Sequence, residues 1–183
     1  IGELNVHARR TLHDAIDPAC FVIEARDGTR VGIASDLGYV DEYVLRHLQN
    51  CDGLFFESNH DLDMLRLGSY PWPLKRRIMS RFGHLSNDDS MVALQRMLGA
   101  ETKTLCMIHL SQKNNHESIV HEMTSALLET KAKSGKWTAD QEKEFTDLSQ
   151  RQGKLVDLVN DFALKFIEKN QSMIRVNPAW GAV

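Results

Sequence analysis

Short apolar runs separated by polar turns dominate the first two thirds of the chain. Four of these runs predict strands, at residues 20–25, 30–34, 54–56 and 104–108. The Asp27-Gly28 pair between the first two runs is typical of a hairpin turn. Residues 1–12 are mixed in character and are also expected to be extended. The pattern predicts a sheet of short strands.

Apolar residues at helical spacing predict three helices between and after these strands. The first covers residues 41–49, with Val44, Leu45 and Leu48 facing inward. The second is capped by Ser86 or Asn87, runs to Leu98 and ends at Gly99; its expected apolar face is Val92, Leu94, Met97 and Leu98. The third covers residues 114–133, with Ile119, Met123, Leu127 and Ala126 on one face. Together with the strands, these helices predict a layered α/β protein.

The last fifty residues have a different pattern. Ser134-Gly135 breaks the preceding helix, and Thr138 with Gln141 resembles a capping box that opens a longer one. The apolar stripe of this longer helix is Phe145, Leu148, Leu155, Val159, Phe162 and Phe166. The stripe either packs against its own domain or is a docking or dimerisation face. We expect residues 1–133 to form the core and residues 134–183 a helical extension packed on it.

Composition is ordinary for a single globular domain. The 183 residues are 42% hydrophobic and 26% charged, with a net charge of −3, so any nucleic-acid binding must rest on a local basic patch. Cys20, Cys51 and Cys106 lie in or beside apolar runs, which indicates reduced core cysteines and a cytoplasmic protein. No run is long enough to span a membrane. The chain starts at Ile1 without methionine, which indicates a processed, truncated or incompletely represented polypeptide.

Polar residues follow the predicted strands at regular intervals. Asp36, Glu57 and His109 each come directly after an apolar run, and His13 and His84 extend the series at spacings of 21 to 27 residues. Because the carboxyl ends of strands gather along one edge of a layered sheet, we expect the five side chains to converge. The alternative is that each is an isolated polar residue at the start of a loop.

The segment from residue 54 to 87 carries the candidates for substrate binding. Tyr70-Pro71-Trp72-Pro73 predicts a rigid, non-helical bend. The basic cluster after it could receive phosphates, and Tyr70 or Trp72 could stack on a base. The substrate-binding candidates are Asn59, His60, Trp72, Lys75, Arg76 and Arg77. The alternative is a solvated surface loop and helix start whose arginines pair with nearby carboxylates.

His and Asp side chains from separate strand ends are suitable ligands for zinc, manganese or iron. A bridging Asp36 favours two divalent ions, one held also by His13 and the other by His109. Two such ions can activate water against a phosphodiester. Glu57 would then orient His84, whose imidazole could protonate the leaving oxygen.

Several strings in the sequence resemble the YycJ/WalJ (VicX) group of metallo-β-lactamase-fold hydrolases. The resemblance runs from about His13 to Asn115, and its most specific strings begin at Glu57 (ESNHD), Tyr70 (YPWPLK) and Gly83 (GHLSN). It implies an αββα sandwich and a phosphodiesterase related to ribonuclease Z, with 5′-to-3′ exonuclease activity on DNA. By this resemblance His13, Asp36 and His109 correspond to metal-ligand motifs, and Glu57 with His84 to the pair that protonates the leaving group.

The chain departs from this family at both ends. The H-x-H-x-D-H signature, which supplies most metal ligands, is absent and should lie upstream of His13; the helical region after Lys133 is also not accounted for. The missing half therefore lies outside this sequence, is supplied by another chain, or has been lost together with catalysis. The expected function is a metal-dependent nuclease, with single-stranded DNA as the favoured partner. The alternative is a non-catalytic half-domain that acts as a structural or interaction subunit, in a homo-oligomer or with a partner chain. A β-lactamase or thioesterase fits the arginine-rich segment less well.

Overall fold

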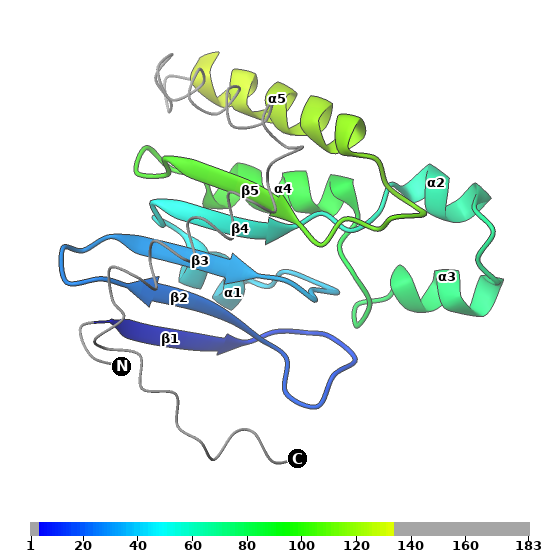
Figure 1. The fold of residues 1–183 in the computed structure, drawn as a ribbon, viewed down its shortest axis with the longest axis horizontal. Coiled ribbons are helices and arrows are strands. Elements are labelled where there is room, and N and C mark those ends of the chain that lie inside the picture. The colour runs from blue at the N-terminus through cyan, green and yellow to red at the C-terminus, as the bar shows by residue number, and fades with distance from the viewer. Residues whose placement is uncertain (1–3, 134–183) are drawn as a thin grey trace.

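The computed structural model describes residues 4–133, which form one five-stranded mixed sheet with helices (Figure 1). The strands lie side by side in chain order: β1 (Asn5–Arg10), β2 (Ala19–Glu24), β3 (Arg30–Ala34), β4 (Gly53–Glu57) and β5 (Thr104–Ile108). The β1–β2 and β2–β3 pairs are antiparallel, whereas β3, β4 and β5 run parallel. The four predicted strands and the extended start are confirmed, and so is the Asp27-Gly28 turn, where Gly28 has a φ of 85°.

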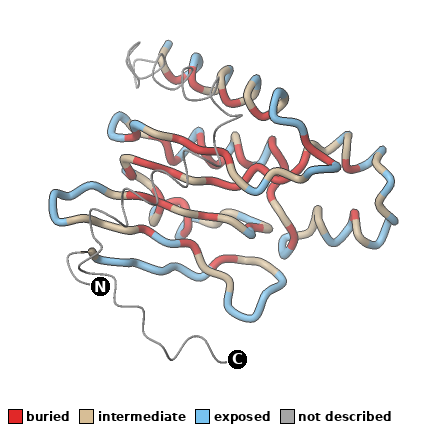
Figure 2. The backbone as a smooth tube through the Cα atoms, viewed as in Figure 1, coloured by how far each residue is buried: buried red, intermediate tan, exposed pale blue. Residues whose placement is uncertain are grey.

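The hydrophobic core lies between the sheet and the helices α1 (Glu42–Leu48) and α4 (Asn87–Met97), which Figure 1 shows behind the sheet. Val120 and Leu128, from the last described helix, belong to the same core. Phe56 pairs in register with Ala34 and Met107, and all three are buried in this core. Each large side chain so buried contributes about 1.5–3 kcal/mol. The inner side of α1 is as predicted. Burial is concentrated in the central strands, whereas β1 is exposed along its whole length (Figure 2).

Two short helices, α2 (Leu62–Leu67) and α3 (Trp72–Ile78), lie beyond the carboxyl ends of the parallel strands (Figure 1). The prediction of a non-helical bend at the two prolines is wrong. Pro71 is the N-cap of α3 and Pro73 lies in its first turn, where the missing N–H costs no intrahelical hydrogen bond. The prolines therefore start a helix here.

The two longer helices form where expected, but parts of their inner faces differ. Ser86 caps α4 as predicted, yet Val92 is 61% exposed, and Ala93 faces the core beside Leu94 and Met97. Helix α5 (Glu117–Lys133) begins three residues later than predicted and packs against α4. Its buried residues are Val120, Thr124, Leu128 and Lys131. The predicted face of α5, by contrast, is half-buried or exposed.

The lysine on this inner face has a structural role: Lys131 Nζ donates to the Leu98 carbonyl over 2.8 Å. The three cysteines are buried and form no disulfide, as expected. Within residues 4–133 no helix is long and apolar enough to cross a membrane. The predicted helix with the Phe145 to Phe166 stripe lies outside the described residues, so the division at residue 133 stays a prediction.

Candidate active site

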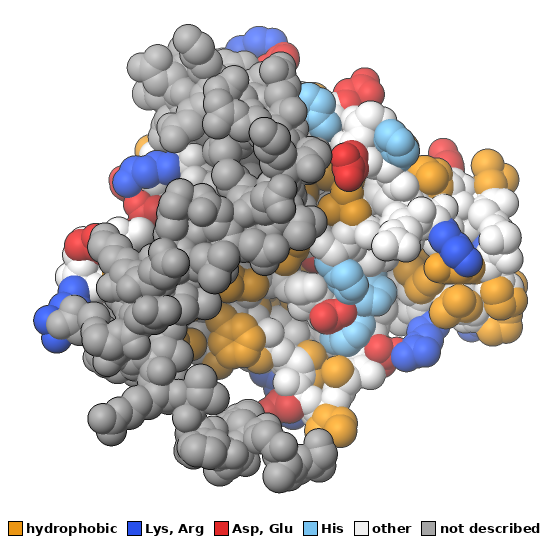
Figure 3. Space-filling view, viewed as in Figure 1, with side chains coloured by type: hydrophobic (Ala, Val, Ile, Leu, Met, Phe, Trp, Pro, Cys, Tyr) orange, Lys and Arg blue, Asp and Glu red, His pale blue; other side chains and the backbone are white. Residues whose placement is uncertain are grey.

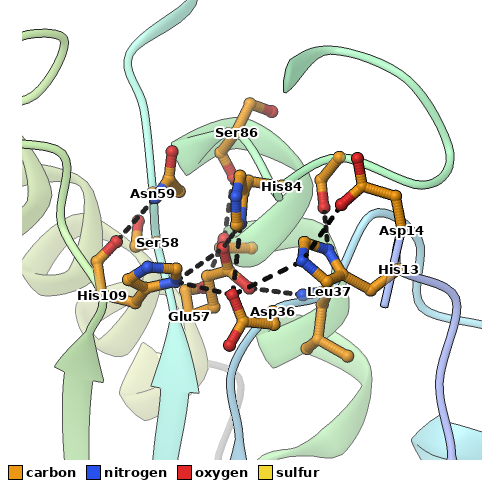
Figure 4. A network of polar contacts seen from close by, with 12 residues as sticks. His13, Asp14, Asp36, Leu37, Glu57, Ser58, Asn59, His84, Ser86 and His109 are labelled. Carbon is orange, nitrogen blue, oxygen red and sulfur yellow. Dashed lines mark hydrogen bonds and ion pairs between the residues drawn. The ribbon is translucent and has the colours of Figure 1, made fainter. Parts of the chain in front are cut away.

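The five polar residues predicted to converge do meet at the carboxyl edge of the parallel strands (Figure 4). Asp36 follows β3, Glu57 ends β4 and His109 follows β5. His13 enters from the β1–β2 connection and His84 from the loop between α3 and α4. The ring centroid of His84 lies 4.9 Å from the rings of both His13 and His109. The spacing in the sequence therefore gave a correct prediction of proximity.

Glu57 is the buried centre of the site. Its side chain is fully buried, and its Oε2 accepts a 2.6 Å hydrogen bond from the Leu37 backbone N–H. Its Oε1 accepts from His84 Nδ1 at 2.7 Å and lies 3.3 Å from His109 Nδ1. The pairing of Glu57 with His84 was expected, whereas the contact of the same oxygen with His109 was not.

This arrangement keeps Glu57 ionised. Burial raises the pKa of the Glu57 carboxyl, but donors from His109, His84 and the Leu37 N–H outweigh burial and hold the pKa below its ordinary value. The hydrogen bond between His109 and Glu57 also raises the pKa of His109, although burial of the His109 ring lowers it. An ionised carboxylate only accepts hydrogen bonds. The Nδ1 atom of His84 therefore carries the hydrogen, and Nε2 is the nitrogen that can meet a substrate.

Asp36 lies at the front of the site, among three imidazoles. Its side chain is 52% exposed, and Oδ1 lies 3.7 Å from His13 Nε2, 3.6 Å from His109 Nδ1 and 3.9 Å from His84 Nδ1. The His13 ring is fixed from the other side, where its Nδ1 lies 2.8 Å from the Gly83 carbonyl oxygen. Figure 3 shows imidazole and acidic side chains gathered in one patch on this face, with a basic side chain beside it.

The backbone is held in an uncommon conformation at two of these residues. Asp36 and His109 have φ values of 58° and 59°, in the left-handed region that non-glycine residues seldom adopt. Each directly follows or nearly follows the end of a buried strand, so the left-handed residue turns the chain sharply. Strained backbone of this kind clusters at functional sites, where surrounding contacts must hold it.

Two glycines allow the loops of the site to pack backbone against backbone. A Cβ on Gly83 would lie 2.1 Å from the Ile78 carbonyl oxygen, and one on Gly38 would lie 2.3 Å from the Arg81 carbonyl oxygen. The backbone N–H of His84 donates to the same Ile78 oxygen over 2.9 Å. The loop that carries His84 thus needs glycine before it.

A buried network of amides and hydroxyls supports the end of β4, and our sequence reasoning missed its role. Asn115 Nδ2 donates to the Ser58 and Asn59 carbonyls at 2.8 and 3.0 Å, and Asn87 Nδ2 donates to Asn115 Oδ1 at 3.0 Å. Ser90 Oγ donates to the carbonyl of Glu57 at 2.7 Å. The only signals were that Asn87 lies in the GHLSN string and that the family resemblance extends to Asn115, because burial of an amide cannot be read from its type.

A cleft of about 440 Å³ opens beside His13, His84 and His109. Asn59, a predicted substrate-binding residue, lines this cleft. However, its side chain is largely buried and its Nδ2 donates to the His109 carbonyl over 2.9 Å. Asn59 therefore positions the backbone of His109.

The exposed candidates lie on or near α3. Arg77 and Tyr70 line the cleft, whereas Trp72 and Arg76 are exposed but are not among its lining residues. The Arg77 guanidinium pairs with Asp14, and this hydrogen bond holds the Asp14 pKa below its ordinary value. Of the two aromatic residues predicted to stack on a base, Tyr70 lines the cleft and Trp72 does not.

Two predicted substrate-binding residues are buried, and their assignment is wrong. Only 1% of His60 is exposed, and burial first of all lowers its pKa to about 4, so the imidazole is neutral at pH 7. Lys75 is 7% exposed, and its Nζ donates to the carbonyls of Arg66 and Gly68, both at 2.7 Å. Lys75 therefore ties α3 to the end of α2, and it is not among the residues that line the cleft.

The donor atoms of the site fit a divalent metal. Two overlapping groups, His13–Asp36–His84 and Glu57–His84–His109, each have their ligand atoms within 4.8 Å of one another. Imidazole and carboxylate are ligands that zinc, manganese and iron accept. Asp36 lies between His13 and His109, as the sequence predicts for a bridging carboxylate, while the roles of these residues as ligands stay a prediction.

Comparison with known proteins places the chain in a family. Exodeoxyribonuclease WalJ of Streptococcus pneumoniae is 39% identical over 120 residues, which are 66% of this chain and 44% of the relative. Exodeoxyribonuclease YycJ of Bacillus anthracis is 35% identical over 130 residues, which are 71% of this chain and 49% of the relative. The chain thus matches just under half the length of these curated relatives. No family model matches the chain.

A comparison with solved structures identifies the fold. The metallo-β-lactamase fold protein YhfI of Bacillus subtilis superposes with a TM-score of 0.52 at 13% identity, over 69% of this chain and 44% of that one. This likeness confirms the predicted fold class, α/β of the metallo-β-lactamase type. The two exodeoxyribonucleases at 35–39% identity show that the chain belongs to the YycJ/WalJ group of metallo-β-lactamase-fold proteins.

Proposed function

We propose that this chain carries the proton-transfer half of a metal-dependent phosphodiesterase site that acts on nucleic acid. The observation that carries the proposal is the Glu57–His84 hydrogen bond, which faces a cleft lined by His13 and His109. A fully buried carboxylate that orients a partly exposed imidazole is the arrangement expected of a general acid or base. The names of the two curated relatives support an exodeoxyribonuclease.

Metal ions would be held by His13, Asp36 and His109, in which Asp36 Oδ1 lies 3.7 Å from His13 Nε2 and 3.6 Å from His109 Nδ1. Bound divalent ions supply activation of water and neutralisation of phosphate charge in such a site. We propose two ions, zinc or manganese, with iron as a further candidate, because Asp36 lies at similar distances from both histidines.

His84 delivers the proton that the leaving oxygen needs. Its Nδ1–H is engaged by Glu57, so the protonated ring donates from Nε2. Glu57 fixes the orientation of the ring and stabilises its positive charge while the proton is held. Since the carboxylate is itself kept ionised by the Leu37 N–H and His109, it does not compete for that proton.

The finer substrate assignment rests on the cleft. Arg77 offers a guanidinium for a phosphate, and Tyr70 offers a ring on which a base can stack. Stacking needs an unpaired base, which favours single-stranded DNA over duplex. We propose cleavage in the 5′-to-3′ direction, as the family resemblance implies.

Hydrolysis of bis(p-nitrophenyl) phosphate and of end-labelled single-stranded DNA tests this function. Activity should require added zinc or manganese and should fall about 100-fold or more in His84→Ala and in Asp36→Asn. The matched control is His116→Ala, since His116 is exposed at the start of α5. Equal rates for the parent and the two site variants would show that these residues do not carry the chemistry.

A further inference from the structure

A second concavity, of about 770 Å³, lies away from the histidine site. It is formed by the edge strand β1, the end of β2, the start of β3 and helix α1, and its volume is within the range of ligand pockets. Its main lining side chains are Arg9, Arg30, Arg46, Tyr43, His47 and Glu24. Arg30 begins β3, whereas Asp36 follows the end of the same strand, about 20 Å away at the rise of an extended chain.

The pocket is strongly basic. Three guanidinium groups line it, and the one carboxylate, Glu24, lies 3.6 Å from His7 Nε2. Burial lowers the pKa of His47, which therefore adds no charge at pH 7. Arg30 is held in place, because its Nη1 donates to the carbonyls of Gln49 and Asn50 at 3.1 and 3.3 Å. A fixed excess of positive charge of this kind attracts phosphate groups.

The pocket also offers an aromatic surface. Tyr43 is 65% exposed on α1, and the Arg9 guanidinium lies 5.8 Å from the centre of its ring. A large exposed aromatic ring among arginines has no role in the core of this domain. Basic grooves interleaved with aromatic rings are the chemistry that binds single-stranded nucleic acid, through phosphate contacts and base stacking.

We propose that this pocket is a second subsite for single-stranded nucleic acid, in which Arg9, Arg30 and Arg46 receive backbone phosphates and Tyr43 stacks on a base. The identity of the ligand rests on the proposed function. The subsite holds a part of the strand remote from the bond that is cut, so it contributes to affinity and grip on the strand and leaves the chemistry at His84 unchanged.

Binding of a fluorescently labelled oligothymidylate of about 12 nucleotides to the full 183-residue chain tests the subsite. EDTA is present, so no strand is cut. Fluorescence anisotropy should show affinity at least about fivefold weaker in Tyr43→Ala and in Arg46→Gln. The slope of log affinity against log salt should fall by about 0.7 in Arg46→Gln, as expected for one lost phosphate contact. Lys133→Gln removes one exposed positive charge at the end of α5 and is the matched control.

Unchanged affinity in both pocket variants, or a loss as large in Lys133→Gln, overturns the proposal. A duplex of equal length that binds as tightly as the single strand, with no effect of Tyr43→Ala, overturns it as well. Hydrolysis of bis(p-nitrophenyl) phosphate, which fills only the histidine cleft, should be the same in the pocket variants and the parent. Failure of that hydrolysis in the parent chain, with intact oligonucleotide binding, counts against the proposed function alone.

Discussion

The Nδ1 atom of His84 donates a 2.7 Å hydrogen bond to Oε1 of Glu57, a carboxylate with no exposure to solvent. The same carboxylate accepts from the Leu37 N–H and lies 3.3 Å from His109. The buried Glu57 carboxylate therefore fixes the positions of the Leu37 backbone, the candidate proton donor His84 and the candidate metal ligand His109 relative to one another. Glu57 should matter both for stability and for activity.

Replacing Glu57 by Gln should separate these two roles. A glutamine has one acceptor oxygen and an NH2 group, so at least one of the donors around residue 57 loses its partner, which costs about 1–3 kcal/mol. Phosphodiester hydrolysis should fall about 100-fold or more, because the His84 ring is no longer held in the productive tautomer. Urea unfolding and kcat on the chromogenic diester measure the two effects. A variant that keeps the parent's kcat would contradict the role given to the pair.

Gly83→Ala should displace the loop that carries His84. The added Cβ would meet the Ile78 carbonyl oxygen at 2.1 Å, so the backbone must move, at a cost of about 1–3 kcal/mol or more. Gly99→Ala is the control, because a Cβ there would have its nearest contact at 3.5 Å, from the Asn50 side chain. Thermal unfolding should show a large loss for Gly83→Ala and little change for Gly99→Ala; similar midpoints for the two variants would disprove the packing argument.

Lys75→Met should weaken the fold and leave substrate affinity intact. The substitution leaves the carbonyls of Arg66 and Gly68 without their buried donor, which costs about 1–3 kcal/mol. Arg76→Met, on the exposed side of the same helix, should change stability by no more than about 0.5 kcal/mol. Denaturant titration of both variants checks the difference. If Lys75→Met instead raised KM for DNA with unchanged stability, Lys75 would be a substrate ligand after all.

The pH dependence of stability should carry a signature of His60. The pKa of His60 is about 4 in the folded chain, below the ordinary 6.5. Between pH 4 and pH 6.5 the unfolded chain therefore binds a proton at this residue that the folded chain does not bind. Stability should therefore fall as pH drops from 6.5 toward 4, by up to about 3 kcal/mol from this residue. The raised pKa of His109 acts in the opposite sense, since its contribution is lost as pH rises.

Comparison with His60→Leu isolates that contribution. Neither ring nitrogen of His60 has a hydrogen-bond partner in the part of the chain that the structure describes, so leucine should be tolerated at neutral pH. Free energies of unfolding measured at several pH values should then show a flatter profile for the variant between pH 4.5 and 6.5. Parallel profiles would mean that His60 does not stay neutral in the folded chain.

The sequence predicted the strands and the meeting of the five polar residues, because both follow from local periodicity and from where strands end. It did not predict the face of α5, since Ile119 and Val120 begin two adjacent apolar stripes and only packing against α4 selects between them. The burial of Lys75 could not be predicted for a related reason, because its hydrogen-bond partners are backbone carbonyls at the end of another helix. The contact between His109 and Glu57 was also not predicted, because His109 has a left-handed φ that cannot be inferred from its residue type.

Metal content of the purified chain tests the proposed chemistry most directly. Elemental analysis after extensive dialysis should find about two ions of zinc, manganese or iron per chain, and fewer in Asp36→Asn and His109→Ala. The controls are His116→Ala and the parent dialysed against chelator and reloaded. A parent chain that holds no divalent ion, and whose site variants behave identically, would contradict the metal site and favour a non-catalytic half-domain.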